Sequence, residues 1–93
     1  MPVEVRLPTL LRPAAGGASS VEIEGATVGE VLAALETAHD GLAGQVLGGD
    51  GDLHRFVNVY LNDDDVRYLE RLDTKVGPGD VLSILPAVAG GGA

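Results

Sequence analysis

The 93-residue sequence contains no cysteine and no tryptophan. Without thiols the chain can form neither a disulfide nor a thiolate zinc site, and no side-chain thiol can carry sulfur. Aromatic residues are also scarce, because Phe56, Tyr60 and Tyr68 are the only ones. The core must therefore be built from aliphatic side chains, and the chain lacks a stacking platform for single-stranded nucleic acid.

Basic residues and long apolar runs are lacking as well. Six basic residues stand against 14 acidic ones, which gives a formal net charge of −8. This sign disfavours binding to a phosphate backbone or an anionic membrane and favours a basic partner protein. The sequence shows no apolar signal region and no stretch of about 20 apolar residues that could span a bilayer. We therefore expect a cytoplasmic protein that binds neither nucleic acid nor membrane.

The residues that are present favour one folded unit. Apolar residues make up 45% of the chain and charged residues 22%, a mixture typical of a globular domain. The length leaves room for a single hydrophobic core. We expect a domain over residues 1–86, followed by a flexible, glycine-rich tail over residues 87–93.

Alternation of apolar and polar residues predicts the strands. The alternating segments lie at residues 3–7, 21–24 and 57–61, with a short return strand at residues 66–68 and a last β-rich run at residues 81–86. Adjacent short strands near the N-terminus predict a hairpin.

A helix is predicted between the second and third strands. Thr27 stands three residues before Glu30, which is the spacing of a capping box. We expect the helix to run from Thr27 to about His39, with Gly41 placed to end it. An apolar stripe at intervals of three and four residues should face the sheet. It consists of Val28, Val31, Leu32, Leu35 and Ala38.

The remaining segments carry turn residues. Pro13, Gly16 and Gly17 predict a loop after the first strand, and residues 41–54 predict a loop with room for one short helical turn. Residues 63–65 are three aspartates that predict a solvated turn, because they lack the ligand spacing of a calcium loop. The two histidines stand singly, so no metal site is expected.

The order of these elements predicts the fold class. Strand, strand, helix, strand, short strand, strand is an α+β arrangement in which one main helix crosses one face of a mixed sheet. This is the order of the β-grasp, or ubiquitin-like, fold. Because many activities share small α+β scaffolds, the function has to be argued from a site.

Three segments stand out by their sequence: LPTLLRP at residues 7–13, LHRFVNVYLND at residues 53–63 and ILPAVAGG at residues 84–91. They resemble signature stretches of the ThiS and MoaD family of sulfur carriers, and most closely its actinobacterial members that serve cysteine formation. The resemblance covers nearly the whole chain, and the middle segment is its most specific part.

The resemblance implies a protein cosubstrate rather than an enzyme. In this family an E1-like adenylyltransferase and sulfurtransferase uses ATP and magnesium to adenylate the terminal glycine carboxylate, which then becomes a thiocarboxylate. In the cysteine-forming members the sulfur passes to an activated serine on a cysteine synthase-like enzyme. The carrier itself is expected to bind no cofactor.

The chemistry of the tail can also be argued from its residues. Glycine lacks a Cβ, so Gly90 and Gly91 can pass through a narrow channel into an adenylating site. We expect Gly91 to carry the reacting carboxyl, because the alanine-rich stretch before it aligns there. Since the sequence continues through Gly92 to Ala93, a metallopeptidase or other carboxypeptidase must first trim it. A mature end at Gly92 would require the loss of Ala93 alone.

Strand alternation also predicts a partner-binding face. If Leu82 and Ile84 point into the core, Ser83 and Leu85, which alternate with them, point outward. An exposed cluster of this kind would bind a partner enzyme. The predicted partner-binding residues are Phe56, Asn58, Tyr60, Ser83, Leu85, Val88 and Ala89.

Other functions stay open at this point. The sulfur could serve molybdopterin, thiamin or a specialised thio-metabolite instead of cysteine. A ubiquitin-like modifier would join its terminal glycine to a target lysine, although Lys75 is the chain's only lysine and disfavours self-linked chains. A passive interaction module would tolerate deletion of residues 90–93, whereas a carrier or a modifier would not.

Overall fold

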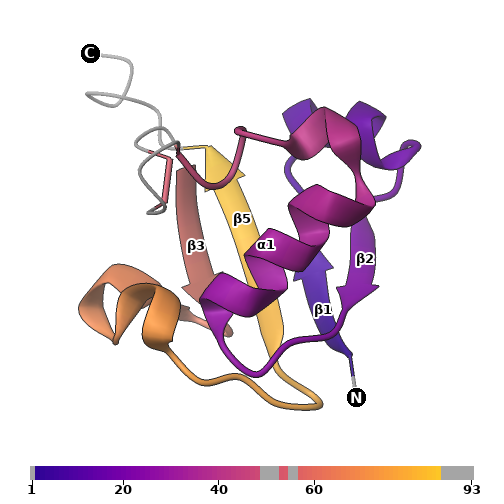
Figure 1. The fold of residues 1–93 in the computed structure, drawn as a ribbon. Coiled ribbons are helices and arrows are strands. Elements are labelled where there is room, and N and C mark those ends of the chain that lie inside the picture. The colour runs from indigo at the N-terminus through magenta and orange to yellow at the C-terminus, as the bar shows by residue number, and fades with distance from the viewer. Residues whose placement is uncertain (1, 49–52, 55–56, 87–93) are drawn as a thin grey trace.

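A computed structural model describes residues 2–48, 53–54 and 57–86. It shows a five-stranded mixed sheet, with the helix α1 lying across one face (Figure 1). This confirms the predicted α+β architecture. In the spatial order β2-β1-β5-β3-β4, the strands are β2 (Ser20–Ile23), β1 (Val3–Arg6), β5 (Val81–Pro86), β3 (Val57–Leu61) and β4 (Asp64–Asp65).

The central strand of the sheet is the last of the described strands along the sequence. β5 pairs in parallel with β1, where Val5 stands beside Leu82, and it pairs antiparallel with β3, where Val59 stands beside Ile84. β1 also forms the predicted hairpin with β2. The first and the last of the described strands therefore lie side by side in the middle of the sheet.

The start of α1 (Val28–Ala38) agrees with its prediction. The Thr27 Oγ1 accepts a hydrogen bond of 3.2 Å from the Glu30 backbone N–H, and the Glu30 carboxylate accepts one of 2.9 Å from the Ala26 N–H. These two bonds satisfy backbone donors that have no partner inside the helix. The capping residues thus fix where the helix begins.

The end of α1 differs from its prediction. The helix ends at Ala38 with His39 as its C-cap, and Gly41 lies in the following 3₁₀ turn, η2 (Asp40–Leu42). A Cβ on Gly41 would lie only 2.8 Å from the Ala14 Cβ. The glycine is therefore needed for close packing between two segments and does not terminate the helix. The η2 turn is the short helical turn expected in residues 41–54, beginning one residue earlier.

An aliphatic core lies between α1 and the sheet. Val28, Val31, Leu32 and Leu35 of α1 are fully buried. The prediction that Ala38 continues this stripe is wrong, because Ala38 is exposed in the last turn. The other buried apolar residues are Val3, Val5, Leu7, Ala15, Ile23, Leu42, Val46, Val57, Val59, Val66, Leu82 and Ile84.

The return after β3 is tighter than predicted. Asn62 adopts a left-handed φ of 57°, which asparagine tolerates, and β4 pairs with β3 immediately afterwards at Asp64 and Asp65. The Asp65 carboxylate then accepts a hydrogen bond from the Arg67 N–H and begins a 3₁₀ turn, η3 (Val66–Tyr68). The prediction of a short strand at residues 66–68 is therefore wrong: the strand begins two residues earlier, and residues 66–68 form η3. A further turn, η4 (Arg71–Asp73), follows.

The loop predicted after the first strand contains a 3₁₀ helix, η1 (Thr9–Ala15). Gly16 ends it with a left-handed φ of 70°, and the Gly17 N–H donates to the Arg12 carbonyl at 2.7 Å. Ala15 is buried and anchors η1 to the core. Over the described ranges, no helix has the length and hydrophobicity to cross a bilayer.

Candidate functional site

The sheet presents a face opposite α1, built from β3 and β5. Val57 and Val59 of β3 are buried, whereas Asn58 and Tyr60, which alternate with them, are half-buried and point to the other side. This is the alternation that a strand with one face against the core must show. The predicted orientation of Asn58 and Tyr60 is confirmed.

β5 shows the same alternation in register with β3. Leu82 and Ile84 are buried, Ser83 is half-buried, and Leu85 is 46% exposed. The pairing sets Asn58 beside Leu85 and Tyr60 beside Ser83. We call the surface formed by Asn58, Tyr60, Ser83 and Leu85 the outer face. Its members come from separate strands, yet they form two adjacent cross-strand pairs.

Part of the predicted partner-binding set lies outside the described residues. Phe56, Val88 and Ala89 belong to this part, as do Gly90 and Gly91, the residues predicted to carry the chemistry. What the structure does give is the starting point of that chemistry, since β5 runs to Pro86. Gly91 is the fifth residue after Pro86, so a fully extended chain could carry it at most about 18 Å from Pro86.

Two arginines beside the outer face were not singled out from the sequence. Arg6 of β1 stands beside Ser83 and forms a 2.8 Å ion pair with Glu4, its neighbour along the same strand face. Both side chains are well exposed, so this pair adds little stability. Its position beside β5 depends on strand order, which the alternation within one strand does not reveal.

Arg67 of η3 fixes the edge of the outer face. One guanidinium nitrogen donates to the Asn58 Oδ1 at 2.8 Å, and the other donates to the Val57 carbonyl at 2.9 Å. The two bonds hold the Asn58 amide in one orientation and bring a positive charge to β3. Nine residues separate Arg67 from Asn58, so sequence spacing gave no signal for this contact.

Two open hollows lie where β5 ends. The first, of about 360 Å³, lies between η1 and the ends of β3 and β5, and it includes His54. The second, of about 540 Å³, lies between β5 and the segment from Arg6 to Arg12; we call it the η1 hollow. Leu10, Leu85 and Pro86 line both, and Leu10 is 78% exposed. Sequence reasoning missed Leu10 because the segment was predicted to be a loop.

The described side chains offer no cluster for a metal ion. In residues 2–48, 53–54 and 57–86, no group of three or more His, Asp or Glu side chains is placed to hold one. The site is instead a flat array of amide, hydroxyl and apolar groups, edged by arginines, next to the point where the glycine-rich segment begins. Such an array is suited to binding another protein surface.

Comparison with known sequences identifies the chain's relatives. The profile of the ThiS family matches residues 5–91. The chain is 47% identical over 93 residues to the sulfur carrier protein CysO of Mycobacterium tuberculosis, covering 98% of this chain and 100% of the relative. It is 46% identical over 66 residues to small archaeal modifier protein 3 of Haloferax volcanii, covering 71% of each chain.

Comparison with solved structures agrees with the sequence relatives. CysO in the crystal structure of the Amycolatopsis orientalis BexX/CysO complex is 48% identical and superposes with a TM-score of 0.85, over 92% of this chain and 96% of that one. The likeness confirms the β-grasp fold predicted from the order of elements. That relative was crystallised together with another protein, BexX.

Proposed function

Because the chain belongs to the ThiS family, we propose that it is a sulfur carrier whose C-terminal glycine is converted to a thiocarboxylate. The observation that carries the proposal is the extent of the family match, which ends at Gly91. The near-full-length likeness to CysO, a named sulfur carrier, supports the same role.

The proposed reaction needs a carboxylate that can reach another protein's active site. The Gly91 carboxylate attacks the α-phosphorus of ATP and displaces pyrophosphate, which forms an acyl adenylate. A sulfide equivalent then attacks the acyl carbon, AMP leaves, and the thiocarboxylate remains. In the proposed cysteine-forming step, the thiocarboxylate sulfur attacks the β-carbon of an activated serine and expels the leaving group of that serine. Hydrolysis of the resulting thioester then frees cysteine and the carrier.

The proposed carrier supplies the reacting group while its partners supply the catalysis. We assign it an E1-like adenylyltransferase and sulfurtransferase, which holds the ATP and magnesium, and a cysteine synthase-like acceptor. The carrier binds neither cofactor in this scheme. In this scheme the outer face docks these enzymes. The crystallisation of a structural relative in a complex with BexX supports the proposal that the carrier binds partner proteins. Use of ATP fits the expected cytoplasmic location.

The proposal includes a trimming step. Because Gly92 and Ala93 follow Gly91, where the family match ends, a free Gly91 carboxylate requires cleavage of the bond after Gly91. A metallopeptidase or another carboxypeptidase would remove the residues after Gly91 and release the Gly91 carboxylate. A chain that still carries those residues is therefore proposed to be an inactive precursor.

Intact-mass measurement of the protein from its native cell tests both steps. Isolation at neutral pH without reductant should give a chain that ends at Gly91 with one carboxyl oxygen replaced by sulfur. A chain that ends at Gly92 would move the trimming site by one residue. A full-length chain that keeps an ordinary carboxylate after incubation with ATP, sulfide and cell extract would refute the proposal.

A ubiquitin-like modifier is the second candidate, favoured by the 46% identity to small archaeal modifier protein 3. It would form the same adenylate but pass the Gly91 acyl group to a lysine amine of a target protein. Digestion of the cell's proteins would then give peptides whose lysines carry a C-terminal remnant of this chain. Detection of the thiocarboxylate without such peptides favours the carrier. Detection of such peptides without the thiocarboxylate favours the modifier.

A further inference from the structure

The η1 hollow combines exposed apolar surface with positive charge. Leu10 is 78% exposed and Leu85 46% exposed, and both line it. Exposed leucines that converge on a concave surface are typical of a protein contact. The hollow shares Ser83 and Leu85 with the outer face and continues from them to Leu10 and Arg12.

The charges around the η1 hollow are opposite in sign to the protein as a whole. Among the described residues that line it, the charged ones are Arg6 and Arg12, in a chain of net charge −8. Arg6 is paired with Glu4 at 2.8 Å. Arg12 uses its Nε to donate to the Leu7 carbonyl at 3.1 Å, and within the described part of the chain its terminal nitrogens have no acceptor. Arg12 is therefore held in place with donors to spare for a carboxylate.

The position of the hollow indicates what covers it. Pro86 lines the hollow, and Gly91 can extend at most about 18 Å beyond it. An enzyme that takes the Gly91 carboxyl into a closed active site must bring its body within that distance of Pro86. Its surface therefore lies near the end of β5, which the η1 hollow borders.

Resting on the function proposed above, we propose that the η1 hollow docks an acidic, apolar segment of the enzyme that activates the C-terminal carboxylate. A carboxylate of that enzyme pairs with Arg12, and an apolar side chain packs against Leu10 and Leu85. The net charge of the carrier favours a basic partner overall, so an acidic segment at this one place gives the complex a defined orientation.

Steady-state kinetics of adenylate formation test this assignment. The assay uses the purified adenylating enzyme of the same organism, ATP, and a carrier that ends at Gly91. Arg12→Gln and Leu10→Ser should each raise the KM for the carrier about tenfold and leave kcat unchanged. The Arg12→Gln effect should shrink between about 0.1 M and about 1 M salt, as the screening length falls from about 10 Å to about 3 Å.

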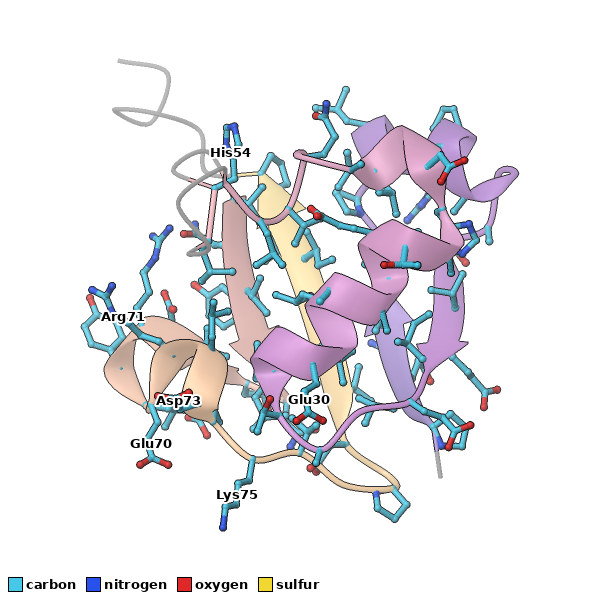
Figure 2. The ribbon with its side chains drawn as sticks, viewed as in Figure 1. Glu30, His54, Glu70, Arg71, Asp73 and Lys75 are labelled. Carbon is cyan, nitrogen blue, oxygen red and sulfur yellow. The ribbon has the colours of Figure 1, made fainter. Side chains whose placement is uncertain are left out.

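Matched variants separate docking from folding. Lys75→Gln also removes one positive charge, but far from the hollows: Lys75 lies at the end of the molecule opposite His54, which lines the first hollow (Figure 2). Leu69→Ser likewise replaces an exposed leucine, one that is 42% exposed. Each should change KM by less than about twofold. Arg12→Lys keeps the charge but not the Nε bond, so it should retain most of the affinity if the charge binds the enzyme.

Each remaining outcome overturns the assignment in a recognisable way. Equal KM values for Arg12→Gln and Lys75→Gln would show that the enzyme does not use the η1 hollow. A dimer in sedimentation that Arg12→Gln dissociates would assign the hollow to a second copy of the chain. A wild-type carrier that forms no adenylate at all would instead refute the proposed function, whatever the variants do.

Discussion

Arg71 adopts a left-handed φ of 53° at the first position of η4. In this region the Cβ of an L-residue crowds the following carbonyl, which costs roughly 1 kcal/mol, whereas glycine has no such contact. The turn is held by its neighbours, because the Thr74 N–H donates to the Arg71 carbonyl at 3.1 Å. The surrounding bonds therefore impose a conformation that arginine alone disfavours.

Replacement of Arg71 with glycine and with alanine separates backbone from side chain. Both variants lose the same interactions, but only Arg71→Ala keeps the Cβ. We expect Arg71→Gly to be more stable than Arg71→Ala by roughly 0.5–1 kcal/mol in the free energy of unfolding, measured by urea denaturation. An alanine variant of equal or higher stability would show that the turn relaxes to a negative φ.

Neighbouring residues of β5 should respond in opposite ways to the same substitution. Leu85→Asp places a charge on the outer face, so we expect the free energy of unfolding to change by less than about 1 kcal/mol while adenylation falls at least about tenfold. Ile84→Asp buries an unpaired carboxylate in the core and should unfold the domain. A large loss of thermal stability in Leu85→Asp would contradict the assigned face.

The candidate site could be predicted from the sequence only in part. Alternation alone placed Asn58, Tyr60, Ser83 and Leu85 outward, because a strand has a fixed period of two. The arginines beside them were missed. Arg67 reaches β3 only because a tight turn at Asn62 returns the chain, and neither turn geometry nor strand order is encoded in the period of a single segment.

At the scale of elements, helix starts were more predictable than helix ends. The capping pair at the start of α1 is local, since its hydrogen bonds join residues three and four apart. Gly41, the residue expected to end α1, is instead required by a contact between segments far apart in the sequence, where it meets Ala14. The 3₁₀ helix η1 was missed for a similar reason. Buried Ala15 and the contact with η2 stabilise it more than Pro13 within it and the glycines that follow it suggest.

The contact between η1 and η2 gives a prediction at this scale. Gly41→Ala adds a methyl group that would lie 2.8 Å from the Ala14 Cβ, so the two turns must separate. We expect a loss of about 1–3 kcal/mol in the free energy of unfolding. Ala14→Gly should restore most of it in the double variant, because it removes the opposing methyl group. A double variant no more stable than Gly41→Ala would show that the steric contact is not the cause.

At the scale of the whole molecule, the domain and its C-terminal segment should be separable. Residues 90–93 are not among the core residues that the structure describes, so we expect their removal to change the free energy of unfolding by less than about 0.5 kcal/mol. Adenylation should be lost completely. Removal of Gly92 and Ala93 alone should instead give a carrier that the purified enzyme adenylates without a peptidase, whereas the full chain is not adenylated.

The outcome of these two truncations decides between classes of function. If partner binding and cellular activity survive the loss of residues 90–93, the protein acts as an interaction module, and the reacting glycine has no role. If the full chain is adenylated as well as the shortened one, trimming is not required. The division of the chain at residue 86 stays a prediction until these variants are measured.

The place of β5 in the sheet also governs when the protein can fold. β5 joins the β1–β2 pair to the β3–β4 pair, yet among the described strands it is the last to be synthesised. A nascent chain without it has two unconnected pairs of strands and a core open on one side, and two-stranded units are marginal in water. The fold therefore forms only after β5 has been synthesised and has left the ribosome. Incomplete translation products should be unfolded and open to proteolysis, so they cannot compete with the finished protein for its partners.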